Sequence, residues 1–313
     1  MAGPAFAVFV AFTFVFGLMA QALTITIFVR DENRHFKLSP YFVNLVVCNL
    51  LLLLSSYPLA FIASVKDAWV GGEIACQASG YIVSVAAAVS FVTMAFFTME
   101  IYRHVTKTDI TINERIQTKR CGKTAKIISF IWVYSCVCVA PPLLGWSSMT
   151  EQSGHTNCAP DWVTQDAEGL SYLIFLVIAV FLIPMAVTAM FFIKLYRYFH
   201  NPQIDVNATP SFLLKIERYK MTLKVVFAAI LANALCWSPY ALYSLVSSFK
   251  GEEMVTGYQS LIPAHFAKIS AVVNPIVYWI FNPRFRKTAK QIIMCSLNKV
   301  QPAPAEDDDQ PSN

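Results

Sequence analysis

Lys268 is the residue whose type and position most clearly suggest chemistry. It is the one charged residue in an otherwise apolar or neutral stretch from 254 to 283. A lysine in the middle of a membrane-spanning helix costs on the order of 3 kcal/mol, and this one lies too deep for its side chain to reach either surface easily. A neutral lysine amine is a nucleophile that condenses with aldehydes to form a Schiff base. The position therefore predicts a functional amine.

The distribution of the other charges predicts the elements that position this lysine. The chain has 313 residues, of which 56% are hydrophobic and only 14% are charged, against about 25% charged in ordinary soluble proteins. Uncharged runs occupy residues 5–29, 41–65, 74–99, 127–150, 169–193 and 225–249. Each run reaches the roughly 20 residues that a helix needs to cross a bilayer. With the stretch around Lys268, seven membrane-spanning helices are predicted.

The predicted fold is an all-α membrane protein, a seven-transmembrane helix bundle with a short amphipathic helix 8. The bundle takes residues 1–283, and its helices are expected at about 5–29, 41–65, 74–103, 125–148, 169–196, 219–249 and 256–282. Residues 284–297 place basic and apolar positions at the spacing of a helix that lies on a membrane surface. Residues 298–313 are rich in Pro and Asp, so we expect a disordered cytoplasmic tail.

The positions of Lys and Arg predict the orientation in the cell membrane. Of the 24 Lys and Arg residues, 21 fall in segments that follow odd-numbered helices, whereas Lys66 and Lys250 lie on the other side. Cytoplasmic loops carry the excess of Lys and Arg, so we expect an extracellular amino terminus and a cytoplasmic carboxyl terminus. This topology explains the net charge of +5. Neither a nucleic-acid partner nor a metal site is predicted.

The eight cysteines divide by compartment. Cys76 and Cys158 are the two on the oxidising outer side, and we predict a disulfide between them. Cys295 follows the amphipathic stretch and is a candidate either for palmitoylation or for a plain thiol. Four others lie within the predicted spans: Cys48, Cys136, Cys138 and Cys236. Cys121 lies in the reducing cytoplasm.

Two motifs beside Lys268 make the chain recognisable. Asn274-Pro275-Ile276-Val277-Tyr278 begins six residues after Lys268, and Cys236-Trp237-Ser238-Pro239-Tyr240 falls in the sixth predicted helix. Together with Ala267-Lys268 at this spacing, they resemble the opsins, the retinal-binding group of rhodopsin-like G-protein-coupled receptors. The resemblance favours a non-visual opsin without resolving the subgroup. It extends from the first helix to the amphipathic helix.

The resemblance implies a retinal site. Lys268 would hold retinal, as the 11-cis or the all-trans isomer, through a Schiff base, and Trp237 and Tyr240 would contact it. Further neighbours are expected at Phe181, Ser84, Ala87 and Trp162. His265 lies one turn before Lys268 on a similar face, and we expect it to be a hydrogen-bonded packing residue.

The residues that could compensate the charge of a Schiff base depart from the family pattern. A protonated Schiff base in a site of low dielectric requires an opposite charge nearby. Many visual opsins place a glutamate three residues after the cysteine that matches Cys76, where this chain has Ser79. The outer-loop acid of many opsins corresponds to Gln152, and Glu151 lies one position earlier. Either Glu151 reaches the Schiff base by a local shift, or the base stays largely unprotonated and absorbs in the near ultraviolet.

The switch motifs of the family are also altered. Rhodopsin-like receptors usually place an acid, Arg and Tyr at the base of the third helix, where this chain has Glu100-Ile101-Tyr102. Arg103 lies two positions after the expected arginine, about 200° around the helix, so we do not expect it to substitute. Asn274, Pro275 and Tyr278 are retained. Phe192 replaces the usual Tyr of the fifth helix, and Gln21 and Asn49 replace Asn and Asp in the first two.

These features predict a photoreceptor in which retinal isomerisation changes the conformation of the receptor, with a heterotrimeric G protein as the partner. The missing arginine weakens the prediction of G-protein activation more than that of light absorption, and two alternatives stay open. One is a retinal photoisomerase of the retinochrome-like kind, whose useful output is the isomerised retinal. The other is a rhodopsin-like receptor for a diffusible ligand. Only the photoisomerase would count as an enzyme.

Overall fold

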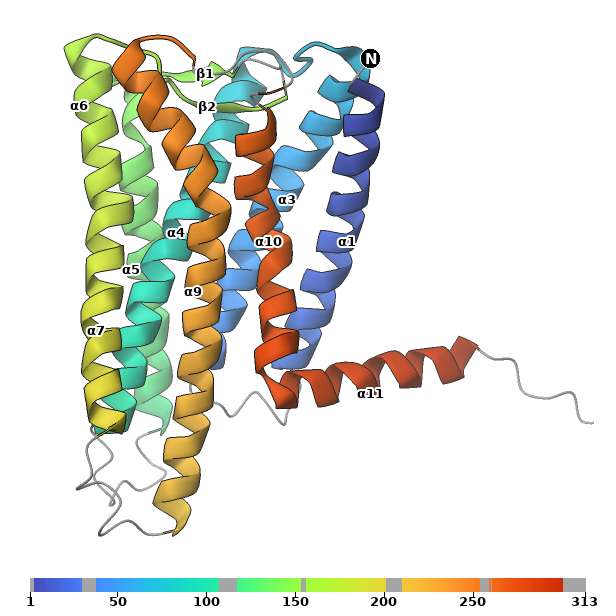
Figure 1. Ribbon diagram of the computed structural model, residues 1–313, viewed down its shortest axis with the longest axis vertical. Helices are drawn as coiled ribbons and strands as arrows, with labels where there is room; N and C mark the ends of the chain where they lie inside the picture. Colours follow the sequence, from blue (N-terminus) through green and yellow to red (C-terminus); the bar gives the residue numbers. More distant parts are fainter. Residues whose placement is uncertain are drawn as a thin grey trace, which may run out of the picture.

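The computed structural model describes residues 3–29, 38–106, 117–152, 156–200, 210–253, 259 and 261–300. Within these ranges, seven helices are long and apolar enough to cross a membrane. They pack side by side as one bundle, and an eighth helix extends away from it (Figure 1). The predicted fold class is confirmed.

The described elements follow one another along the chain. The first four spans are α1 (Gly3–Val29), α3 (Ser39–Lys66), α4 (Gly72–Thr106) and α5 (Gln117–Val139). A 3-10 turn, η2 (Pro141–Leu144), and two strands, β1 (Met149–Glu151) and β2 (Cys158–Pro160), come next. The fifth span joins α6 (Ala167–Leu176), the π-helical η3 (Val177–Leu182) and α7 (Ile183–Phe199). The last elements are α9 (Pro210–Lys250), α10 (Leu261–Phe281) and α11 (Pro283–Val300).

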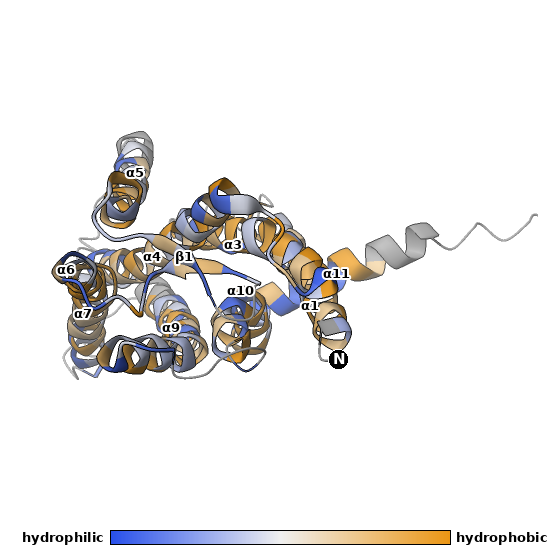
Figure 2. Ribbon diagram, turned by 90° about the horizontal axis from the view of Figure 1, so that it is seen from above, coloured by the Kyte–Doolittle hydropathy of each residue, from blue (hydrophilic) through white to orange (hydrophobic). Residues whose placement is uncertain are grey.

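The spans differ in how much protein surrounds them. α4 and α10 are the most buried, with 67% of their most apolar windows buried, whereas this share is 22% in α1, in α5 and in the span Ala167–Phe199. Phe12 on α1 and Val137 on α5 are 68% and 65% exposed. Seen from above, α5 stands at the edge of the bundle (Figure 2). Large apolar side chains exposed together are unfavourable in water, so the outer faces of α1 and α5 suit contact with lipid.

The fourth span ends earlier than the sequence analysis expected. α5 stops at Val139 instead of continuing to 148. Pro141 and Pro142 follow, and a proline cannot donate the backbone N–H that would extend the helix. The chain forms the 3-10 turn η2 and then reverses at Gly145, whose φ of 92° favours glycine.

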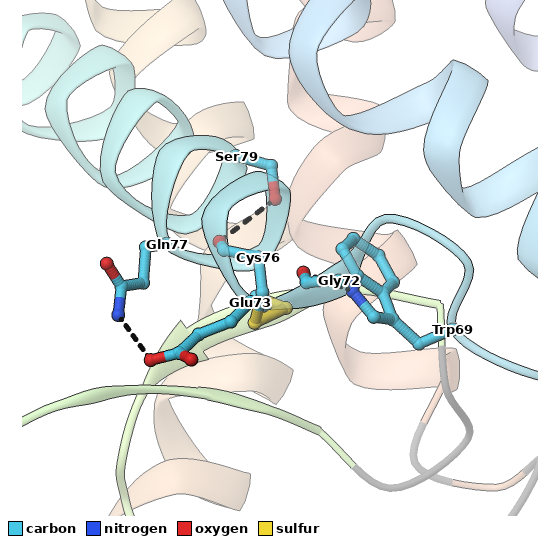
Figure 3. The surroundings of a disulfide bond; sticks show 7 residues. Trp69, Gly72, Glu73, Cys76, Gln77 and Ser79 are labelled. Carbon is cyan, nitrogen blue, oxygen red and sulfur yellow. Dashed lines mark hydrogen bonds between the residues drawn. A yellow bond between two sulfur atoms is a disulfide. The ribbon is translucent and has the colours of Figure 1, made fainter.

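A short hairpin covers one end of the bundle. β1 pairs with β2 in an antiparallel register that sets Glu151 opposite Cys158, and both strands lie at the end where α1 begins (Figure 1). The disulfide predicted between Cys76 and Cys158 is present and ties β2 to α4 (Figure 3). A Cβ at Gly80 would come within 3.2 Å of the Cys158 carbonyl oxygen, so the close approach of strand and helix requires glycine there.

The helix α11 begins at a capped turn at the opposite end of the bundle (Figure 1). The Asn282 side-chain oxygen accepts hydrogen bonds from the N–H groups of Arg284 and Phe285, at 3.1 and 3.2 Å. Phe285 and Ala289 are buried against the bundle. The helix continues to Val300, so residues 298–300 are helical rather than part of a disordered tail. Residues 301–313 and the side chain of Cys295 lie outside the described part of the chain.

We predict that Cys76→Ser destabilises the fold, because the disulfide restricts the unfolded chain across a separation of 82 residues. The expected loss in the free energy of unfolding is on the order of 2–5 kcal/mol, seen as a lower midpoint of thermal unfolding in detergent. Cys136→Ser is the matched control, because Cys136 is a free cysteine. Equal midpoints for the two variants would contradict a stabilising role of the disulfide.

Candidate functional site

Lys268 lies inside the bundle on α10, where it is 5% exposed. In the described part of the chain, its Nζ atom has no hydrogen-bond partner. The side chain lines a small pocket that is partly open to solvent. The other polar side chains of this pocket are neutral: Ser56, Ser79, Thr156 and Asn157. The amine therefore shares its pocket with hydroxyl and amide groups.

The position of the expected carboxylate is taken by a hydroxyl. Ser79 is buried, lines the same pocket as Lys268, and donates a hydrogen bond to the Cys76 carbonyl at 3.2 Å (Figure 3). Glu151 ends β1 with its side chain exposed, whereas its neighbour Gln152 is buried. No carboxylate lines this pocket among the residues that the structure describes. The side chain that could serve as a counterion thus lies on the outer surface.

A row of aromatic rings runs through the bundle from η3 to the outer loop. Phe181 packs edge-on against Phe91 on α4, with ring centroids 5.5 Å apart. Phe91 in turn packs against Trp237 on α9, at 6.0 Å, and Trp237 lies 6.4 Å from Tyr240. The Tyr240 hydroxyl accepts a hydrogen bond of 2.7 Å from the indole of Trp162. Four residues expected at the site therefore lie in one continuous row.

Phe91 completes this row and was missed by the sequence analysis. Ser84, Ala87 and Phe91 follow a spacing of three and four residues on α4, so they share one face of that helix. Ala87 is buried and Ser84 is half-buried. This spacing was the signal that could have added Phe91. Phe181 is 37% exposed, so its ring also forms part of the outer surface of the bundle.

His265 packs away from the aromatic row, towards α1 and α3. Its ring meets Phe6 and Tyr57 edge-on, at centroid distances of 4.6 and 5.7 Å. The packing role is as expected, but the expected hydrogen bond is not formed. Neither ring nitrogen has a partner within the described ranges, because the neighbours on this side are aromatic faces and edges rather than acceptors.

The outer loop is joined to α9 by three hydrogen bonds. Besides the Trp162–Tyr240 bond, the Ser248 hydroxyl donates to the Trp162 carbonyl at 2.7 Å. The Gln165 amide donates to the Ser248 carbonyl at 2.8 Å. Asp166 then caps α6, and hydrogen bonds from Thr164 and the backbone N–H of Gly169 lower the pKa of its carboxyl. The loop is therefore held on both α4 and α9.

Comparisons with known proteins identify the family. Residues 21–278 match the family model described as "7 transmembrane receptor (rhodopsin family)". The chain belongs to the rhodopsin family of seven-transmembrane receptors. It is consequently a multi-pass membrane protein, and the relatives that it resembles are opsins.

Melanopsin-B of Xenopus laevis is 28% identical over 286 residues, which cover 89% of this chain and 53% of that protein. Pinopsin of Columba livia is 24% identical over 279 residues, covering 88% and 77%. The receptor spans about half the length of the melanopsins that it matches. The crystal structure of squid rhodopsin has the same fold, with a TM-score of 0.83 at 22% identity, over 96% of this chain and 88% of that one.

In this receptor, the end that bears α11 contains a cluster of charges around Glu100. The guanidinium of Arg103 donates to this carboxylate at 2.7 Å, and His104 and Lys123 lie 3.8 and 3.9 Å from it. Ile101, which holds the place of the usual arginine, is fully buried in the core. Arg103 therefore pairs within its own helix.

The remaining switch positions are occupied as follows. The Gln21 amide donates to the backbone carbonyl of Ala271 on α10, so α1 is still tied to α10. Phe192 packs against Phe227 in a tilted arrangement, with ring centroids 4.7 Å apart, so its contact is apolar. Tyr278 packs edge-on against Phe42 at 5.3 Å. Asn49, Asn274 and Pro275 lie within the helices α3 and α10, and both asparagines are buried.

We predict that the Trp162–Tyr240 hydrogen bond stabilises the receptor by about 1 kcal/mol, a typical net value for such a bond. Tyr240→Phe and Trp162→Phe should each lower the midpoint of thermal unfolding. The double variant should lose less than the sum of the two, with a coupling of about 0.5–1.5 kcal/mol in a double-mutant cycle. Strictly additive losses would show that the bond contributes nothing.

Proposed function

We propose that this receptor is a photoreceptor that holds retinal covalently through Lys268. The observation that carries the proposal is an amine that is 5% exposed, has no hydrogen-bond partner in the described chain and faces a pocket. An amine in that position is costly to the fold and gains nothing from packing. Condensation with an aldehyde turns the amine into an imine with loss of water, so a buried amine at this position has a chemical use.

The residues near Lys268 fit a ligand with one aldehyde and a long apolar chain. Trp237, Tyr240, Phe181 and Trp162 would line the chain with aromatic surface, and Ala87 and Ser84 leave room on the facing side of α4. When bound, retinal supplies the absorption of light and the isomerisation of a double bond. The protein contributes the attachment point, an apolar lining and an outer loop that limits access of water.

The link between Lys268 and α9 supports a conformational output. The indole of Trp237 on α9 donates to the hydroxyl of Ser270 on α10, two residues after Lys268, at 3.2 Å. Pro239 interrupts the hydrogen bonding of α9 just beyond this contact, and prolines are the usual sites of helix bending. A change of shape beside Lys268 would therefore act on α9, which continues to the end that bears α11.

The orientation follows from the distribution of basic residues. We infer that the hairpin end faces the outside of the cell and the α11 end faces the cytoplasm, because 21 of the 24 Lys and Arg residues lie in segments at that end. The basic side chains of α11 would contact the inner leaflet of the bilayer. A displaced α9 would expose a basic surface to a heterotrimeric G protein.

We predict that Lys268 alone attaches retinal. After incubation with 11-cis- or all-trans-retinal and reduction with borohydride, the wild-type chain should gain one retinyl group by mass spectrometry. Lys268→Ala should gain none, because it lacks the amine.

Lys66→Ala and Lys250→Ala are the matched controls, since both lysines lie at the outer ends of helices, and both variants should be labelled like wild type. Covalent labelling of a folded Lys268→Ala variant would overturn the proposed function.

A second candidate function is retinal photoisomerisation. The observation that favours it is the absence of an arginine at position 101, where Ile101 is buried in the core. The guanidinium that rhodopsin-like receptors usually place there helps to stabilise the active state, and Arg103 pairs with Glu100 instead. A receptor with this change could bind and isomerise retinal without activating a G protein.

Light-dependent nucleotide exchange separates these two functions. We predict that illuminated, retinal-bound receptor accelerates exchange of a fluorescent GTP analogue on added heterotrimeric G proteins several-fold over the dark rate. Lys268→Ala should give the dark rate under illumination. Extraction of the retinal, followed by chromatography of its isomers, should accompany the assay. Isomer conversion without any exchange on the major classes of G protein would favour the photoisomerase.

A further inference from the structure

The pocket beside Lys268 lacks the one feature that a protonated nitrogen requires. A cation in a low-dielectric site costs several kcal/mol unless an opposite charge compensates it. The pocket offers only neutral groups. Hydroxyls and amides can orient around a charge, but they cannot neutralise it. The Lys268 nitrogen must therefore either stay neutral or be compensated by an anion from solution.

Four carboxylates near the hairpin are engaged elsewhere or exposed, and Asp67, Glu168 and Glu252 at the same end are exposed as well. Glu73 accepts a hydrogen bond from Gln77 at 3.1 Å, on the outside of α4 (Figure 3). Asp161 accepts from the backbone N–H of Val163 at 2.9 Å. Asp166 caps α6, and Glu151 is exposed at the end of β1. A nitrogen at Lys268 does not meet any of them among the described residues.

The neutral groups of the pocket are donors suited to an anion. Thr156 donates to the Asn157 side-chain oxygen at 3.4 Å, so the amide nitrogen of Asn157 keeps both of its N–H groups as donors. Within the described ranges, no acceptor contacts that amide nitrogen. Ser79 has a hydroxyl that rotates about its bond, so it can exchange its contact with the Cys76 carbonyl for an anion.

The pocket also lies where a solute can reach it from outside. Thr156, Asn157 and Cys158 come from the outer hairpin, and Trp69 comes from the turn that joins α3 to α4. These residues, rather than the spanning helices alone, form part of its wall. The space beside Lys268 is therefore bordered by loops on the side that we infer to be extracellular.

We propose that this pocket binds a small monovalent anion of the size of chloride, which supplies the counter-charge to the Lys268 nitrogen in the retinal-bound receptor. The proposal rests on the proposed function, because the charge in question belongs to the protonated linkage. The anion would lie between the Lys268 nitrogen and the donors of Ser79 and Asn157. It would explain how a site without a carboxylate can keep a protonated nitrogen.

The test compares absorption spectra of the retinal-bound receptor in sodium gluconate and in sodium chloride at equal ionic strength. In gluconate, whose anion is too large for the pocket, the receptor should absorb in the near ultraviolet. Added chloride should move the maximum into the visible in a saturable manner.

Variants of the pocket sharpen the test. Ser79→Ala should weaken the apparent affinity for chloride about tenfold or more, since it removes one hydrogen bond to a charged group. Ser56→Ala removes a second hydroxyl of the pocket and replaces Ser79→Ala in this test if Ser79→Ala does not fold. Ser90→Ala is the matched control, because Ser90 lies on the same helix and donates to the Ala86 carbonyl; its chloride response should equal that of wild type. Ser79→Glu should absorb in the visible without chloride.

The outcomes separate the two proposals. A receptor that gains the mass of retinal but absorbs in the near ultraviolet at every chloride concentration overturns the anion site alone. Visible absorption that does not depend on chloride, and that is lost in Glu151→Gln, also overturns the anion site. It would assign the counter-charge to Glu151. A receptor that gains no retinal mass overturns the proposed function together with the anion site.

Discussion

The burial of one amine without an opposite charge is the constraint on which the site depends. A lysine in the middle of a span costs on the order of 3 kcal/mol, and a leucine at position 268 would instead contribute to packing. The surrounding groups reduce the cost only in part, since Ser79 and Asn157 are neutral. Because stability alone disfavours Lys268, its presence is best explained by the chemistry of its nitrogen.

The outer hairpin makes such a site possible by covering it. The Cys76–Cys158 disulfide holds β2 on the first turns of α4, and Gly80 lets strand and helix approach closely. The Trp162 and Ser248 hydrogen bonds hold the other end of the loop on α9. The cover is fixed at both ends, and residues of its hairpin border the pocket of Lys268. Restricted access of this kind protects a linkage that water can hydrolyse.

The sequence predicted the seven spans well because membrane burial imposes long uncharged runs, and it predicted the disulfide because only two cysteines lay on the oxidising side. It failed where local chemistry overrides hydropathy. The apolar run to residue 150 hid the end of α5, which Pro141 and Pro142 impose. Phe91 was missed because an aromatic residue in an apolar helix is more often ordinary core, although its spacing placed it on the same face as Ser84 and Ala87. For His265, the lack of a partner for the ring nitrogens within the described ranges could not be foreseen, because it depends on which side chains the facing helices supply.

The end of α4 nearest α11 shows how one shifted charge alters the contacts between the helices. Glu100 is paired with Arg103 and His104 on its own helix and with Lys123 on α5. None of its ion pairs within the described residues reaches α9. At this end, His104 stacks on Tyr219 of α9 with ring centroids 6.4 Å apart, beside the buried Ile101. Movement of α9 would therefore leave the ion pairs of Glu100 described above intact. Salt screens ion pairs, so it should affect this movement less than in a bundle closed by a salt bridge between α4 and α9.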